Sequence, residues 1–185
     1  SAPRVADLPG DYLTKALSVP TLSPTPTTFT QNIGDGLYNE RDVDLYEFDL
    51  VLGQTLTVSV APTSGSSLDA NLRLYDYEGN LVASNGEAEE GPSGPNSPLE
   101  YRMIRTPGAG TVVKHYLAVT GKANTPTSIF TVPTSPPPTT WTAADRGGYQ
   151  VSLVVDVPPG PDAISDDAAG ALFLATTPQT TTTYT

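Results

Sequence analysis

Hydrophobic and polar positions alternate along most of this chain with the two-residue period of a β-strand. In the clearest case, Tyr46, Phe48 and Leu50 fall on one side of an extended chain. Glu47 and Asp49, which lie between them, fall on the other side. This pattern predicts a half-buried strand with one face towards a core. The same reasoning predicts strands over residues 27–33, 44–50, 56–60, 72–75, 81–84, 99–104, 115–120 and 149–155.

Short turn segments separate these strands. Gly53 and Gln54 lie between the second and third strands, and we expect those two strands to form a hairpin. Residues 72–75 and 81–84 are expected to form another hairpin around Gly79, which needs a positive φ in so tight a turn. Since no stretch shows a convincing helical period, the pattern indicates an all-β protein.

The predicted fold class is all-β, an antiparallel jelly-roll-like β-sandwich of about seven to nine strands with long loops. The long loops lie at 85–98 and 121–147, where Gly, Pro and polar residues replace the alternation. We divide the chain into a lead-in segment (1–30), a sandwich core (31–157) and a C-terminal segment (158–185).

The C-terminal segment is similar in sequence to the lead-in segment. With a shift of 155 positions, residues 7–30 align with 162–185 without a gap, and nine of the 24 positions are identical. Five of those nine are Thr, which both segments hold in excess. We favour the start of a second repeat. The alternatives are a Thr-rich linker and a strand that docks on a neighbouring molecule through Thr182, Thr183 and Tyr184.

Composition narrows the classes of partner. The formal net charge is −11, with 20 Asp+Glu against 9 Lys+Arg, so nucleic-acid binding is not expected. No apolar run approaches the ~20 residues of a membrane-spanning helix, so we expect no membrane insertion. The chain has no cysteine, which excludes disulfides and thiolate metal sites. An acidic, lysine-poor composition keeps an extracellular or cell-surface protein soluble, and the lack of cysteine does not exclude secretion.

A series of motifs supports a family resemblance. The motifs are Ile33-Gly34-Asp35-Gly36, Asp42-Val43-Asp44-Leu45-Tyr46-Glu47-Phe48, Gly53-Gln54-Thr55-Leu56-Thr57-Val58, Leu68-Asp69-Ala70-Asn71-Leu72-Arg73-Leu74-Tyr75-Asp76, Gly79-Asn80-Leu81-Val82-Ala83-Ser84-Asn85, Tyr116-Leu117-Ala118-Val119 and Gly148-Tyr149-Gln150-Val151-Ser152-Leu153. In this order and spacing, over about residues 7–156, they resemble the bacterial pre-peptidase C-terminal (PPC) domain family. This chain departs from the family pattern in its two longer loops and in extra residues over 110–116.

The resemblance implies a jelly-roll-like β-sandwich that is not catalytic. Members of the family accompany secreted proteases and collagenases or form part of surface proteins. They are associated with export and with substrate or matrix binding. In some members calcium is bound near the N-terminal linker, which implies a similar site here.

Four acidic residues lie close together before the second predicted strand. They are Asp35, Glu40, Asp42 and Asp44. Calcium takes six to eight oxygen ligands, and Asp42 and Asp44 point to the same side of an extended chain. We therefore predict that calcium binds here, with a solvated acidic loop as the alternative.

Other side chains give weaker signals. His115 is the only histidine and lies within a predicted strand, so we expect a structural role. A Ser-His-Asp site is not expected, because the chain has no G-x-S-x-G motif. Trp141 and Tyr149 are candidate ligand-binding residues that could stack on a sugar or anchor a protein. In the alternative interpretation, Trp141 covers one end of the sandwich.

Together these features predict a non-catalytic extracellular module of a repeat-containing bacterial surface or secreted protein. Its role would be structural or adhesive, with calcium as a stabilising ion and neighbouring repeats or subunits as partners. One alternative is a carbohydrate- or matrix-protein-binding module attached to a secreted hydrolase. The other is a head-to-tail filament subunit that uses residues 162–185.

Overall fold

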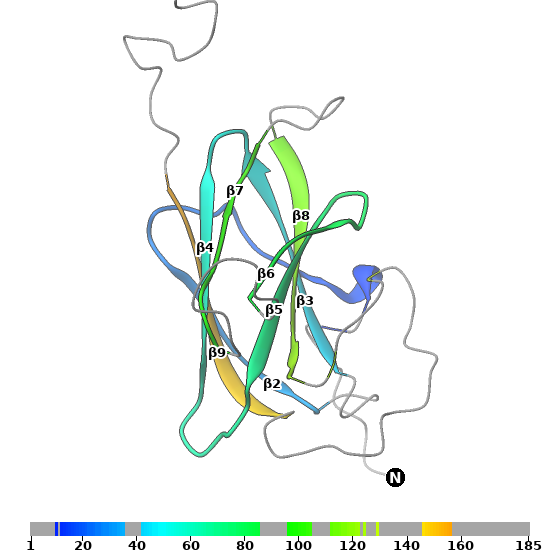
Figure 1. Ribbon diagram of the computed structural model, residues 1–185, viewed down its shortest axis with the longest axis vertical. Helices are drawn as coiled ribbons and strands as arrows, with labels where there is room; N and C mark the ends of the chain where they lie inside the picture. The colour runs from blue at the N-terminus through cyan, green and yellow to red at the C-terminus, as the bar shows by residue number, and fades with distance from the viewer. Residues whose placement is uncertain are drawn as a thin grey trace, which may run out of the picture.

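The computed structural model describes residues 10, 12–35, 42–85, 96–104, 112–122, 124, 129 and 146–156. Over these residues the chain forms nine β-strands and one short 3-10 helix, η1 (Leu13–Lys15). The strands form two sheets that face each other across a common core (Figure 1). The expected all-β sandwich is confirmed.

The two sheets are termed sheet A and sheet B. Sheet A has the strand order β1-β3-β8-β5-β6, and sheet B has the order β2-β9-β4-β7. The strands of sheet A are β1 (Leu17–Ser18), β3 (Val43–Val51), β5 (Ala70–Asp76), β6 (Leu81–Ser84) and β8 (Val112–Gly121). Those of sheet B are β2 (Thr27–Ile33), β4 (Thr55–Pro62), β7 (Leu99–Arg102) and β9 (Gly147–Val155). Among the described pairings, β1 with β3 is parallel and the others are antiparallel.

Of the two predicted hairpins, the structure confirms one and contradicts the other. Strands β5 and β6 pair as expected, and Gly79 in their turn has a φ of 83°. The predicted hairpin of β3 with β4 is wrong, because β3 pairs with β1 and β8 while β4 pairs with β7 and β9. The turn at Gly53 therefore carries the chain from one sheet to the other. Alternation identifies the buried side of a strand but not its partner, and Leu50 and Leu56 enter the same core from opposite sheets.

The lead-in segment is built into both sheets. Strand β1 extends sheet A by pairing Leu17 with Tyr46, and the Val19 N–H donates to the Glu47 carbonyl at 2.8 Å. Strand β2 then forms the edge of sheet B along β9. Val19 and Leu22 are buried in the core between the sheets. The predicted boundary at residue 31 consequently falls within β2.

Two hydrophobic clusters stabilise the fold. The main cluster fills the space between the sheets, and its largest fully buried side chains are Tyr46, Tyr149, Ile33, Leu50, Leu56, Leu68, Leu72, Leu74, Met103 and Leu117. A second cluster covers the outer face of sheet A and consists of Val43, Leu45, Tyr75, Tyr116, Ala118 and Ile129, with Leu13 and Ala16 packed against it. Sheet A is therefore buried on both faces near the start of β3.

Candidate functional site

Asp42 and Asp44 lie at the start of β3, on the same side of the chain as Tyr46. That side faces the space between the sheets, and Asp42 and Asp44 are only 0% and 1% exposed. Asp42 Oδ2 accepts a hydrogen bond from the backbone N–H of Gly34 at 2.5 Å. Gly34 follows β2 of sheet B, so this contact joins the end of β2 to the beginning of β3.

Asp44 belongs to a buried chain of hydrogen bonds that joins the two sheets. The Tyr149 hydroxyl donates to Asp44 Oδ2 at 2.5 Å, and the hydroxyls of Tyr149 and Tyr46 are 2.7 Å apart. Since Tyr149 has only one hydroxyl proton, Tyr46 is the donor in the second bond. The Tyr46 ring also lies near Phe29, with 5.4 Å between ring centroids. Such a buried network stabilises a fold only when its members are satisfied.

Burial keeps both tyrosines of this network protonated. Desolvation, followed by the nearby charge of Asp44, raises the pKa of Tyr149 well above its usual range. The same two causes, in the same order, raise the pKa of Tyr46. A neutral Tyr149 hydroxyl therefore remains available as a donor to Asp44 across the physiological pH range.

The predicted calcium ligands occupy different environments. Asp35 is exposed at the end of β2, whereas Asp42 and Asp44 are buried and each has an oxygen in an internal hydrogen bond. Glu40 lies outside the described residues. Within the described ranges, no group of three or more Asp, Glu or His side chains is placed to hold a metal ion. Calcium binding therefore stays a prediction.

The proposed ligand-binding role of Tyr149 is wrong. Its side chain is 0% exposed and its hydroxyl is engaged by Asp44, so its ring is not accessible to a sugar. Alternation along β9 placed Tyr149 on the core side, and this was the stronger signal. Trp141 lies outside the described residues, and so do Thr182, Thr183 and Tyr184 of the predicted assembly segment.

His115 has a structural environment, as the sequence indicated. It lies in β8 and is 1% exposed. Its Nδ1 is 3.0 Å from the carbonyl oxygen of Val113, which can only accept, so Nδ1 carries the proton. Burial lowers the pKa of His115. Its ring lies 5.5 Å from that of Tyr101, between centroids.

Two asparagines that sequence analysis missed complete the edge of β5. Strand β6 pairs with β5 only from Arg73 onwards, so the edge groups of Ala70 and Leu72 need other partners. Asn85 Oδ1 accepts from the Leu72 N–H at 2.6 Å, and the Asn85 N–H donates to the Leu72 carbonyl at 3.1 Å. Asn85 Nδ2 also donates to the carbonyl of Ser97 at 2.9 Å. Asn85 thus makes the two hydrogen bonds to Leu72 that a residue of a neighbouring strand would make.

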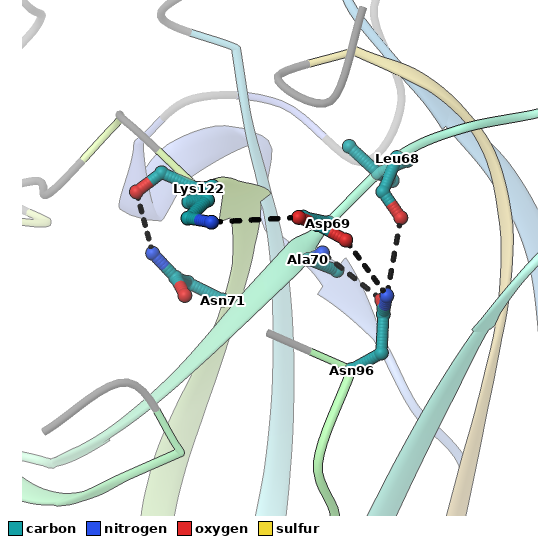
Figure 2. Close-up of polar contacts among 6 residues, drawn as sticks. All are labelled: Leu68, Asp69, Ala70, Asn71, Asn96 and Lys122. Carbon is teal, nitrogen blue, oxygen red and sulfur yellow. Dashed lines mark hydrogen bonds and ion pairs between the residues drawn. The ribbon is translucent and has the colours of Figure 1, made fainter. Parts of the chain in front are cut away.

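Asn96 engages Ala70 in the same way (Figure 2). Its Oδ1 accepts from the Ala70 N–H at 3.0 Å, and its own N–H donates to the Ala70 carbonyl at 2.9 Å. Its Nδ2 donates to the Leu68 carbonyl at 3.3 Å and to Asp69 Oδ1 at 3.4 Å. Asn96 has a φ of 63°, a left-handed conformation that Asn adopts more readily than most residues. An Asn in a Gly- and Pro-rich loop signals such a turn but not its partner.

Asp69 and Asn71 are also used structurally. Asp69 Oδ2 lies 3.6 Å from Lys122 Nζ, and Asn71 Nδ2 donates to the Lys122 carbonyl at 2.9 Å (Figure 2). These contacts join the start of β5 to the end of β8. The polar side chains around this point stabilise the loops rather than form an open site.

A surface hollow of about 520 Å³ opens where the end of β2, the β4–β5 loop and the start of β9 meet. Hydroxyl groups of Thr63, Ser64 and Ser66 and the amide of Asn32 line it. Among the described residues of the lining, Arg146 is the only charged one. The hollow is therefore polar, with one fixed positive charge at its wall.

Two glycines allow the β4–β5 loop to lie directly on β9 beside this hollow. A Cβ atom on Gly147 would lie 2.4 Å from Ser66 Oγ, and one on Gly148 would lie 2.4 Å from Thr63 Oγ1. Gly147 also has a φ of 138°, which side chains rarely permit. The Thr63 N–H donates to the Gly148 carbonyl at 3.0 Å. This hydrogen bond and the close approach of the two side chains hold the loop against β9.

Comparison with known proteins shows distant structural similarity. No protein-family model matches the chain, and neither does any curated protein. The fold is similar to that of Aeromonas hydrophila PliG, a periplasmic lysozyme inhibitor of g-type lysozyme, with 11% identity and a TM-score of 0.44. The alignment covers 76% of this chain and 96% of that chain. A similarity at this level carries no argument about function, and the resemblance to the PPC family stays a prediction.

In the described part of the chain, no helix is long and apolar enough to cross a bilayer.

Proposed function

We propose that this chain is a non-catalytic extracellular β-sandwich module that acts as a structural unit of a repeat-containing surface or secreted protein. The proposal rests on the observation that the lead-in segment forms part of both sheets. It supplies the edge strands β1 and β2 to the two sheets. A second copy of that segment, at 162–185, is therefore the natural beginning of a second such unit.

The positions shared by the two segments support this interpretation. The tail carries Leu172 and Leu174 at the positions that correspond to Leu17 and Val19 in the lead-in. In the structure, Leu17 packs against the core and Val19 is buried in it. The aromatic residue at Phe29 of the lead-in also has an aromatic counterpart in the tail. The tail thus keeps apolar side chains at the positions of Leu17, Val19 and Phe29, whereas the buried Leu22 corresponds to Thr177.

The buried polar groups support a structural role rather than catalysis. Asp44, Tyr149 and Tyr46 satisfy one another in the core, and His115 donates to a backbone carbonyl. Groups that a catalyst would expose to substrate are here used to hold strands in place. An acidic surface with few lysines keeps such a module soluble outside the cell, and a chain of this length can fold without disulfides.

A matched pair of variants in the full chain tests the proposal. Val19→Asp places a charge in the core and is expected to lower the melting temperature sharply. Leu174→Asp changes the corresponding tail residue and is expected to leave the melting temperature of this unit unchanged. Circular dichroism measures the melting, and light scattering coupled to size-exclusion chromatography measures the mass.

The proposal fails if Leu174→Asp destabilises the unit as Val19→Asp does. It also fails if the unmodified chain forms concentration-dependent assemblies that Leu174→Asp dissolves. That second result would support the filament alternative, in which the tail binds a neighbouring subunit.

A further inference from the structure

The polar hollow at the end of sheet B has no part in the structural role proposed above. Thr63, Ser64 and Ser66 are among its lining residues, and their hydroxyls can both donate and accept hydrogen bonds, with Ser66 Oγ already accepting one from the Leu68 N–H at 3.3 Å. The Asn32 amide adds a further donor and acceptor. The described residues of its lining offer hydrogen-bonding groups and one charge to a ligand.

Arg146 supplies the charge of the hollow. Its side chain is exposed, and no hydrogen bond or ion pair joins it to another described residue. Two described lysines differ in this respect, since Lys114 pairs with Glu47 at 3.2 Å and Lys122 with Asp69 at 3.6 Å. A guanidinium group presents a planar set of donors that matches a carboxylate with two parallel hydrogen bonds.

The backbone beside Arg146 is held in place before any ligand binds. The Ser66 and Thr63 side chains lie close against the backbone of Gly147 and Gly148, and Gly147 has a φ of 138°, which side chains rarely permit. The hydrogen bond from Thr63 to the Gly148 carbonyl fixes the loop against β9. A site with preorganised walls loses less conformational entropy on binding than a mobile one.

The geometry points to a binding site for a sugar that carries a carboxylate, a hexuronate residue of an acidic glycan. Arg146 binds the carboxylate, while the hydroxyls of Thr63, Ser64 and Ser66 bind the hydroxyls of the ring. A volume of about 520 Å³ lies within the range of small-molecule sites and admits about one or two sugar rings. The net charge of −11 repels extended polyanions, which favours an isolated uronate over a long polyuronate.

The test is a titration of the isotope-labelled full chain followed by NMR. D-glucuronate, D-glucose and acetate are added separately, and the amide shifts of Thr63, Ser66 and Gly148 are recorded. Glucuronate is expected to shift these amides with saturation, and the other two are expected to bind more weakly. Arg146→Gln should weaken glucuronate binding about tenfold or more, and Arg146→Lys should weaken it less, because charge remains without the planar donor set.

Arg102→Gln is the matched control. Arg102 is an exposed arginine on β7, outside the lining of the hollow, so its removal should leave the affinity unchanged. Any of four results would overturn the inference. These are no saturable shift with glucuronate, equal binding of glucose, equal binding of acetate, or unchanged glucuronate affinity in Arg146→Gln.

Discussion

The two sheets of this sandwich bury their strands in different ways. In sheet B, the strands β4 and β9 alternate buried residues with more exposed ones, since only one face meets the core. In sheet A, the strands β3, β5 and β8 contain runs of consecutive buried residues. The difference arises because Leu13, Ala16 and Ile129 cover the outer face of sheet A. A strand with two covered faces loses the alternation by which a strand is recognised in sequence.

Strand β3 is covered on both faces in its first half and on one face in its second half. Val43 and Leu45 point to the outer face of sheet A and are 2% and 0% exposed. Glu47 and Asp49 occupy the same side further along the strand and are increasingly exposed. The outer cover therefore extends over the first half of β3 and not over the second.

The largest expected effect comes from removing a side chain beneath this outer cover. Leu45→Ala leaves a cavity in the second cluster and is expected to lower the free energy of unfolding by about 2–5 kcal/mol. Val154→Ala, on the partly exposed outer side of β9, is expected to cost less than about 1 kcal/mol. Urea unfolding followed by circular dichroism gives both values. Similar losses for the two variants would contradict the difference between the sheets.

The predicted calcium ion would add a contact between the sheets. Asp35 follows β2 of sheet B, and Asp42 precedes β3 of sheet A. A site saturated at 100 times its Kd adds about 2.7 kcal/mol of stability. For a chain of this length, calcium should then raise the melting temperature by about 5–10 °C relative to EDTA.

Variants at exposed carboxylates test this site without disturbing the core. Asp35→Asn should abolish the shift in melting temperature, whereas Asp49→Asn, at an exposed position further along β3, should retain it. An unchanged melting temperature in calcium would show that the folded chain does not bind this ion. The acidic residues would then serve solubility and the internal hydrogen bonds of Asp42 and Asp44.

A smaller effect is expected from the tyrosine pair that links the sheets. The folded-state pKa values of Tyr46 and Tyr149 lie above the unfolded value of about 10. The unfolded chain therefore loses these protons first, and stability is lost as the pH rises above about 10. Each residue contributes a slope of about 1.4 kcal/mol per pH unit.

Tyr149→Phe tests this link at two pH values. At pH 7 the variant removes a buried hydrogen bond and should cost about 1–3 kcal/mol. Above pH 10 its stability should fall less steeply than that of the unmodified chain, because one buried tyrosine no longer titrates on unfolding. Parallel urea titrations measure both quantities. Equal slopes would show that Tyr149 ionises normally in the folded protein.

Most of the strands could be predicted from the sequence, but their pairing could not. All eight predicted strands are present, and β2 has the predicted bounds of residues 27–33. The short strand β1 was not predicted as a separate element, because two residues carry no periodicity. The pairing of β3 with β8 joins residues far apart in the chain, and no local pattern specifies it.

The candidate site was predicted less well than the fold. The sequence placed Asp42 and Asp44 on one side of β3, and the structure shows that this side is the interior. The edge contacts of Asn85 and Asn96 depend on where β6 ends, which only the folded sheet reveals. The hollow around Arg146 is built from segments far apart in the sequence, so no motif could indicate it.

The sequence alone predicts which segments are strands, which face of most strands is buried, and that the chain is all-β. These properties follow from the local spacing of apolar residues and from turn residues such as Gly79. The tertiary structure decided which strands share a sheet, that sheet A is covered twice, and that two carboxylates lie in the core. The reason is that burial of a polar group depends on a distant partner, here Tyr149 for Asp44, and the partner is brought into contact only by folding.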